Sequence, residues 1–435
     1  MSETTTTKDA TNPCGCPVTL DFRDPQFMTK SRELYTELRG ECPVARITYV
    51  LTEDENGQPQ GFLGQEPYVV TRYAEANAAL LDQRFTVDRE RGMSEEEFAK
   101  IPEEFRPLRR NLLGVDPPDH TRLRKLVQPS FTNRAIEALR PSIQALTDEM
   151  LDEAERAAAA RGETAPNRTI ELVNAFAYPL PVRVICAMLG IPREDEAQVR
   201  EWTELLGLGR GGAMGEERRT ALLNLTDYLK ATFVAKRAKP GDDLISQLVH
   251  AHEDGDSLND EELLSMVFII FLAGHVTTVN LIGSGTLALL THPEQLAKFK
   301  ADPALVKNTV EEVLRYWSPL ETTLPRWATE DVAIDGAVIP AGGTMLAGLA
   351  AANHDPARFP DPESFQIDRE GADRHIAFGK GIHVCFGAPL ARLEGQVVLD
   401  TLFARYPDLR LAVPFEEIPW TQGILRGPAK LPLLF

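Results

Sequence analysis

The stretch that decides the fold is Phe378-Gly379-Lys380-Gly381-Ile382-His383-Val384-Cys385-Phe386-Gly387, and a helical pattern from about Pro389 to Arg405 follows it at once. The glycines allow the backbone to turn sharply and to approach a flat cofactor closely. The positive end of the following helix favours a thiolate over a thiol at Cys385. His383 is placed to donate a hydrogen bond to a carboxylate. A single cysteine in this setting is what an iron–thiolate bond requires.

This stretch resembles the haem-binding loop of the cytochrome P450 family at six positions, which are Phe378, Gly379, Gly381, His383, Cys385 and Gly387. The resemblance implies haem b, iron protoporphyrin IX, held by the axial thiolate of Cys385, a ligand that favours O–O cleavage. It places Phe378 and Gly379 among the residues that bind the cofactor. The alternative for a lone cysteine is a buried free thiol in a glycine-rich loop.

The chain has 435 residues, and no composition break or Gly/Ser linker divides it. We therefore expect a disordered tail over residues 1–15 and a single cytochrome P450 domain over 16–435. The formal net charge of −19 argues against nucleic-acid or anionic-membrane partners, because both favour a basic surface. The polar N-terminus lacks the features of a signal peptide, and no apolar run of membrane-spanning length is expected. These observations predict a cytoplasmic protein.

The five cysteines are scattered and odd in number, which argues against a disulfide framework. Cys14-Gly15-Cys16 lacks the partner pair that a zinc site needs. No C-x-x-C-H occurs, so covalent attachment of a c-type haem is excluded.

Helical periodicity dominates the chain after a strand-rich N-terminal part. A short helix is expected at Arg32 to Arg39, strands over Arg46 to Val70, and a hairpin near 331–347 around Asp335-Gly336. The last thirty residues look extended. Further helices are expected at roughly 119–128, 134–161, 174–190, 194–208, 216–237, 242–252, 259–291, 293–300 and 303–316. The class is mainly α with a minor β portion, which agrees with the cytochrome P450 fold.

The longest helical pattern runs from Asn259 to Leu290, on the order of 48 Å at 1.5 Å per residue. Asn259 and Glu262 suggest a capping box, and the middle is apolar on all sides, as in a helix buried at the centre of a protein. Within it, Ala273 to Thr278 resembles the family's oxygen-binding segment. The resemblance implies that Ala273 and Gly274 cover the haem and that Thr277 hydrogen-bonds dioxygen. The alternative is a Thr277 hydroxyl bonded back to its own helix.

One position departs from the family pattern. An acidic residue commonly precedes the threonine and feeds protons toward oxygen, but this chain has Val276. His275, ordered water or a substrate hydroxyl remain as alternatives. Our hypothesis is that Thr277 and water carry the proton.

Buried haem propionates without cationic partners would cost several kcal/mol each. His120 and Arg124 lie four residues apart in a predicted helix, and Arg326 follows Pro325 in an extended segment. The resemblance implies that these three residues and His383 bind the propionates. The alternative for His120 and Arg124 is a solvated helix surface. Glu312 and Arg315 resemble the family's E-x-x-R pair, which Arg369 should complete. The resemblance implies a structural role for them, pinning the loop that carries Cys385.

The resemblance implies a haem-thiolate monooxygenase that inserts one oxygen atom from O₂ into a C–H bond. A separate ferredoxin and ferredoxin reductase would supply electrons, and Arg122, Lys125, Lys380 and Arg392 are candidates for a docking patch. The resemblance implies a pocket lined by 91–112, roughly 174–210, the Phe268–Thr277 face, Leu320–Leu324 and Gln422–Leu425. These segments carry few charges, so a macrolide, steroid, terpenoid or fatty acid would suit the pocket. The alternatives are a peroxide-driven peroxygenase or isomerase and a non-enzymatic haem carrier or sensor.

Overall fold

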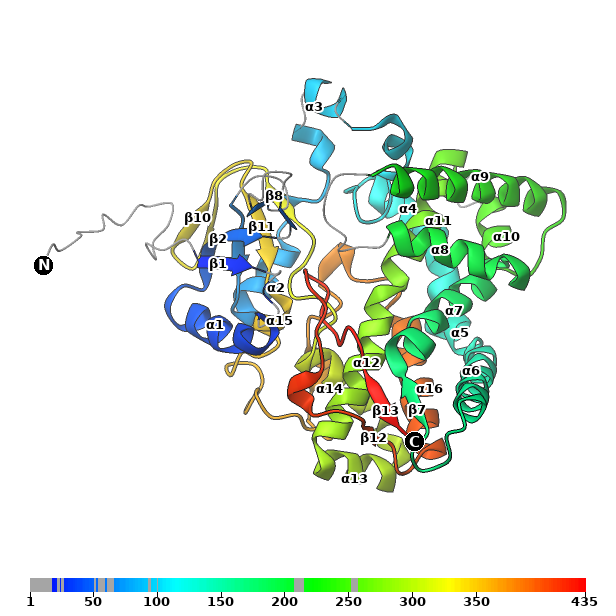
Figure 1. Ribbon diagram of the computed structural model, residues 1–435. Helices are drawn as coiled ribbons and strands as arrows, with labels where there is room; N and C mark the ends of the chain where they lie inside the picture. The colour runs from blue at the N-terminus through cyan, green and yellow to red at the C-terminus, as the bar shows by residue number, and fades with distance from the viewer. Residues whose placement is uncertain are drawn as a thin grey trace, which may run out of the picture.

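The computed structural model describes residues 18–21, 24, 27–50, 52–53, 59–60, 66–92, 95–99, 101–206, 215–251 and 257–435. It is mainly helical with small sheets, so the predicted fold class is confirmed. In Figure 1 the largest sheet and its helices lie on one side of the molecule, and the bulk of the helices lies on the other. The predicted tail, residues 1–15, lies outside the described residues.

The largest sheet has six strands in the order β1-β2-β5-β11-β8-β6. It joins the N-terminal part of the chain to a segment more than 240 residues later, because β5 pairs with β11 in parallel. The helices α1 (Phe27–Glu41), α2 (Tyr73–Leu81) and α15 (Leu349–Ala352) pack around it. The strands are β1 Val18–Asp21, β2 Val44–Val50, β5 Tyr68–Val70, β6 Phe85–Thr86, β8 Arg326–Ala328 and β11 Thr344–Ala347.

The predicted hairpin is confirmed. Strands β9 (Val332–Ile334) and β10 (Ala337–Ile339) pair antiparallel. Asp335 and Gly336 connect them with φ of 44° and 81°. Positive φ at both turn positions matches the right-handed twist of the two strands and explains the Asp-Gly sequence.

The helices lie where the periodicity predicts them, and several of them are shorter than expected at one end or both. The expected helix at 134–161 is divided into α5 and α6, and the one at 174–190 begins as a π-helical turn, Val173–Ala177. The remaining helices are α3 Glu95–Ala99, α4 Asp119–Val127, α5 Asn133–Glu137, α6 Arg140–Ala160, α7 Pro179–Leu189, α8 Glu196–Leu206, α9 Glu216–Ala238, α10 Leu244–Val249, α13 Pro293–Ala301, α14 Val306–Tyr316 and α16 Ala388–Arg405. The three-stranded sheet β12-β13-β7 (Arg410–Leu411, Pro432–Leu434, Thr169–Glu171) ties the C-terminus to the π-helical turn.

The central helix is two helices rather than the one that periodicity predicts. Helix α11 spans Asp260–Gly274 and α12 spans Val276–Thr291, with His275 between them at φ −82° and ψ −80°. The capping box of Asn259 and Glu262 is confirmed. Helix α12 packs against α14 and α16, so the interruption lies at the centre of the protein (Figure 1).

By length and composition, Asp260–Thr291 is a stretch of described residues that could cross a membrane. However, 72% of its most apolar window is buried inside the protein, so its apolar character serves the core. The expectation that no such stretch exists is corrected by this finding.

Cysteine usage also differs from expectation. Among the described cysteines, Cys186 and Cys385 carry free thiols, whereas Cys42 is disulfide-bonded. The odd number of cysteines therefore does not exclude a disulfide.

Candidate active site

One cavity of about 360 Å³ brings together residues that the sequence separates by more than 260 positions. Its walls come from α4, from the junction of α11 and α12, from β8, and from the loop that leads into α16. All ten residues predicted to form the site line it: His120, Arg124, Ala273, Gly274, Thr277, Arg326, Phe378, Gly379, His383 and Cys385.

The loop before α16 fixes Cys385 on the cavity wall. The Cys385 amide donates a 2.9 Å hydrogen bond to the Phe378 carbonyl, which closes the loop on itself. Gly379 and Gly381 have φ of 70° and 77°, a conformation that side chains disfavour. A Cβ at Gly381 would also lie 3.0 Å from the Leu80 carbonyl oxygen. Glycine at 381 is therefore required both by the turn and by the neighbouring helix α2.

Cys385 is exposed in this structure and lines the cavity. Burial raises its pKa, while the amides of Gly387 and Ala388 and the charges of Arg124 and Arg392 act in the opposite direction. These groups stabilise a thiolate, as expected at the N-terminus of α16. Cys186 differs, because it is fully buried away from this cavity and burial raises its pKa to about 12.

Two arginines place their positive charges at the cavity. Arg124 donates to the carbonyl oxygens of Ile382 and Val384, at 2.7 and 3.0 Å. Arg326 donates to the Leu80 carbonyl oxygen at 2.8 Å. A guanidinium group has five N–H donors, so these backbone contacts orient it and leave capacity for a carboxylate. Arg124 is partly exposed and lines the cavity, so it is not a wholly solvated residue of the helix surface.

His120 is 2% exposed, and its Nε2 is buried without a hydrogen-bond partner among the described residues. Burial, together with the nearby His383 and Arg124, lowers its pKa to about 4. A neutral imidazole nitrogen left unpaired in a cavity is a place for a further hydrogen-bonding group.

The carboxylate that His383 contacts belongs to a residue of the protein, Asp116. Its Nε2 lies 3.0 Å from Asp116 Oδ1, and its Nδ1 lies 3.2 Å from the Leu112 carbonyl oxygen. Burial alone would raise the pKa of Asp116, but hydrogen bonds from His383 and Thr86 outweigh it and lower the pKa to about 2. The sequence motif alone assigns no role to Asp116, and the structure shows that it orients His383. Both ring nitrogens of His383 have partners within the protein, whereas a contact with a haem propionate was expected.

This donor set fits haem b. A thiol lies on one wall, and two guanidinium groups and the unpaired His120 nitrogen lie on the same cavity as partners for two carboxylates. Ala273 and Gly274 offer a wall without bulky side chains. A Cβ at Gly274 would lie 3.0 Å from Ile185 Cδ1, so this part of α11 is already closely packed.

The threonines at the start of α12 use the carbonyl groups released by the interruption. Thr277 Oγ1 donates to the Ala273 carbonyl oxygen at 2.7 Å, and Thr278 Oγ1 donates to that of Gly274 at 3.0 Å. The back-bonding alternative for Thr277 is thus present, and Thr277 lines the cavity as well. His275 lies elsewhere, because its Nε2 is 3.1 Å from the Tyr178 carbonyl oxygen and its ring packs on Tyr178.

The predicted network of Glu312, Arg315 and Arg369 is present and buried. Arg315 binds the Glu312 carboxylate at 2.7 and 2.8 Å, and Arg369 Nε lies 3.1 Å from both of its oxygens. Both arginines also donate to carbonyl groups of the segment 353–364. The network therefore holds this preceding segment rather than the cysteine loop itself.

The contact with the cysteine loop comes from Glu311, which sequence reasoning left without a role. Its carboxylate accepts hydrogen bonds from Arg392 on α16 and pairs with His375 before the loop. Arg392 also lies over the Phe378 ring, 4.7 Å from its centroid. The i, i+3 spacing identified Glu312, whereas no local signal identifies Glu311.

Glu394 was also missed. It is 1% exposed, lines the cavity from α16, and its Oε2 has no hydrogen-bond partner among the described residues. Burial raises its pKa to about 8. Its sequence context, an acidic residue within α16, resembles that of a solvated helix face and gives no sign of burial.

The remaining cavity wall is apolar, and it draws on every region predicted to line the pocket. Val87, Leu113 and Leu349 also line the cavity, although they lie outside the regions that were predicted to do so. The lining residues from the predicted regions include Leu112, Ile185, Met188, Ile270, Leu320, Leu324 and Ile424.

Comparison with known proteins identifies the same family that the cysteine loop resembles. The sequence model of the family described as "Cytochrome P450" matches residues 214–431. The 6-deoxyerythronolide B hydroxylase of Saccharopolyspora erythraea is 39% identical over 95% of this chain and 98% of its own length. The cytochrome P450 monooxygenase PikC of Streptomyces venezuelae is 42% identical over 92% and 89%. The solved structure of the bacillaene polyketide synthase cytochrome P450 PksS of Bacillus subtilis covers 95% of this chain and 99% of its own, with 38% identity and a TM-score of 0.83.

Proposed function

Because this chain belongs to the cytochrome P450 family and is a haem-thiolate monooxygenase, we propose that it oxidises a polyketide macrolactone or a similarly large, mostly apolar metabolite. The observation that carries this proposal is the cavity wall. Apart from the groups that face the thiol and the cationic side chains, the described lining is almost wholly aliphatic. Such a wall binds a substrate mainly by burying apolar surface. Two relatives support the class, since their names give 6-deoxyerythronolide B and mycinamicin IV as substrates.

The experiment is a spectral titration of the purified holoprotein. A panel of 6-deoxyerythronolide B, a steroid, a terpenoid and myristic acid is added to the ferric protein, and the low-to-high spin shift is recorded. A shift with the macrolactone, followed by a product one oxygen atom heavier, supports the proposal. A shift confined to myristic acid would instead indicate a fatty-acyl substrate, and a myxobacterial relative has been solved with that ligand.

Within this function we propose Cys385 as the axial ligand and His120, Arg124 and Arg326 as the partners of the propionates, with His383 ordered by Asp116. The bound haem supplies O₂ activation, which the protein's side chains cannot perform. Ala273 and Gly274 leave room for a flat group, and Thr277 presents a hydroxyl to the same cavity. Reduction under carbon monoxide should give the red-shifted Soret band of a thiolate-ligated carbonyl, and Cys385→Ser should abolish it.

We also propose that a cytoplasmic ferredoxin and its reductase deliver the electrons. Support comes from exposed Lys380 in the cysteine loop, close to the proposed ligand. Of the other candidates for the docking patch, Arg122 pairs with Glu262, and Arg392 pairs with Glu311 inside the protein. Because Arg122 and Arg392 form ion pairs within the protein, their charges are partly neutralised. The proposed docking patch therefore depends mainly on Lys380.

Val276 favours a second candidate, a peroxide-driven peroxygenase, because a valine relays no proton. The two cases separate on adding hydrogen peroxide in place of the reductase. Product formation with peroxide at a rate equal to or above that with ferredoxin would favour the peroxygenase.

A further inference from the structure

Two segments far apart in the sequence form one wall of the cavity. The Glu321 amide donates to the Ile424 carbonyl oxygen, and the Arg426 amide donates to that of Pro319, both at 2.9 Å. Leu320 and Leu425 form an isolated antiparallel bridge between them. We refer to these segments, residues 319–324 and 420–428, as the paired loops. Leu320, Leu324 and Ile424 present their side chains to the cavity.

Behind this wall lies a buried ion pair. The Arg426 guanidinium lies 2.9 Å from Glu321 Oε1, and the two side chains are 3% and 0% exposed. Tyr35 of α1 donates a 2.9 Å hydrogen bond to Glu321 Oε2. Burial lowers the pKa of Arg426, and the Glu321 carboxylate opposes that shift. Charges buried this deeply are tolerated only when they are paired.

The buried ion pair adds a second constraint on the register of the paired loops, beyond their short backbone pairing. The backbone pairing between the paired loops is one bridge with two amide hydrogen bonds, and a slip of one residue would reverse which side chains face inward. Such a slip would move a charged side chain toward the apolar cavity and leave its partner buried and unpaired. Specifying register is the best-attested role of buried polar groups that contribute little net stability.

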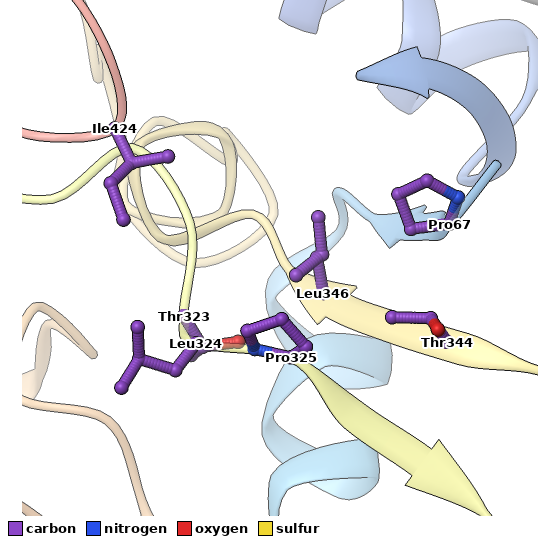
Figure 2. A pocket seen from close by; sticks show the side chains of 7 residues that line it. All are labelled: Pro67, Thr323, Leu324, Pro325, Thr344, Leu346 and Ile424. Atoms are coloured by element: carbon purple, nitrogen blue, oxygen red, sulfur yellow. The ribbon is translucent and has the colours of Figure 1, made fainter. Parts of the chain in front are cut away.

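Figure 2 shows residues of the paired loops and of the sheet region around one small hollow. Leu324 and Ile424 lie on one side of a small hollow, and Pro67 and Thr344 of the sheet region lie on the other. The hollow measures about 10 Å³, room for no more than about one water molecule. With so little space, a shift of either loop is transmitted to the cavity wall.

We propose that the Glu321–Arg426 pair is a register lock that fixes the cavity wall formed by Leu320, Leu324 and Ile424, and thereby determines how the substrate is presented. Neither residue touches the cavity, so both are positioning residues. The inference rests on the proposed function only in taking this cavity as the substrate site.

The test compares Glu321→Gln with Asp243→Asn as a matched control. Asp243 forms a 2.6 Å ion pair with Lys236 between α9 and α10, away from the cavity. Each variant is titrated with clotrimazole, which binds haem iron and reaches the cavity walls, and with imidazole, which binds the iron alone. For Glu321→Gln we expect clotrimazole binding to weaken about tenfold with imidazole unchanged. The Glu321 and Arg426 amides should also exchange hydrogen faster. The control should leave both azole constants and these amides unchanged.

Unchanged azole constants and unchanged amide exchange in Glu321→Gln would overturn the proposal, even if the variant were as destabilised as the control. If Glu321→Gln fails to fold with haem, the double variant Glu321→Leu/Arg426→Met removes both charges and avoids an unpaired one. The proposal expects the double variant to be stable yet to keep the weakened clotrimazole binding. Parental binding in a stable double variant would show that the pair is structural only. Because azoles bind whatever the natural substrate is, failure of the macrolactone titration leaves this test intact.

Discussion

Arg392 donates two hydrogen bonds, of 2.7 and 2.9 Å, to the carboxylate of Glu311. The same carboxylate pairs with His375 at 3.1 Å. Glu311 thus joins α14 to both ends of the cysteine loop, one contact before it and one on the helix that follows it. The stability of the thiolate ligand should therefore depend on a residue outside the cavity.

Glu311→Gln should destabilise the haem-thiolate form by about 3 kcal/mol, because it breaks a largely buried ion pair and leaves Arg392 without its anion. The expected result is faster loss of the thiolate-ligated carbonyl band on warming. The measurement is the rate of that loss, with exposed Glu294→Gln as the control. Equal rates in both variants would contradict the role of Glu311.

The Glu311 contribution should depend on pH. Burial would raise the pKa of Glu311, but hydrogen bonds from His375 and Arg392 outweigh it and lower the pKa to about 2. A lowered pKa stabilises the folded state above the ordinary pKa and loses this stabilisation as the pH falls toward the folded value. The difference in unfolding free energy between the parent and Glu311→Gln should therefore shrink from pH 6 to pH 3. Urea unfolding at both pH values measures it.

Glu394 should show the opposite dependence, since burial raises its pKa to about 8. A raised pKa favours folding below the ordinary value of the carboxyl group, and that stability is lost as the pH rises toward 8. Glu394→Gln should therefore be close to neutral at pH 5 and stabilising at pH 8.5. Thermal unfolding at the two pH values tests this, and a variant that is less stable than the parent at pH 8.5 would contradict it.

Arg326→Leu and Arg124→Leu should weaken haem retention, because each variant leaves a buried haem propionate without its cationic partner. The conservative Arg326→Lys should keep most of the affinity, although it loses the paired hydrogen bonds of a guanidinium. Transfer of haem to apomyoglobin measures the loss rate. A rate for Arg326→Leu equal to that of the parent would remove Arg326 from the propionate site.

Val276→Glu and Val276→Asp test the departure from the family pattern. Val276 packs against the same hydrophobic cluster as Leu320 and Leu324, so a carboxyl group there will cost stability. If proton delivery lacks an acid, coupled turnover should rise despite that cost. No change in coupling or in the solvent isotope effect would count against a proton-delivery role at this position.

Lys380→Glu should slow reduction by ferredoxin steeply at low salt, because opposite charges accelerate encounter and salt screens them. Asp373→Lys, at another exposed position, serves as the control. A reduction rate that does not change with Lys380→Glu would exclude docking at this part of the surface.

The sequence predicted the parts of the site that depend on local chemistry. Cys385 with its glycines, the spacing of His120 and Arg124, and the Asp335-Gly336 turn are local signals. The structure brings Cys385, His120 and Arg124 to one cavity and forms the predicted hairpin. Residues whose role depends on tertiary contacts were missed, as with Glu311 and Glu394. Periodicity alone predicted one continuous helix here, although the sequence did raise a Thr277 hydroxyl bonded back to its own helix, and that bond is present at the interruption.

That interruption has a practical consequence for anyone who grafts or idealises this segment. Replacing Thr277 and Thr278 together by strong helix formers such as alanine would favour an unbroken rod through His275. Ala273, Gly274, Thr277 and Thr278 line the cavity at this point, so a change in helix geometry here would change the cavity wall. Stabilising this helix and preserving its chemistry are therefore opposing design goals.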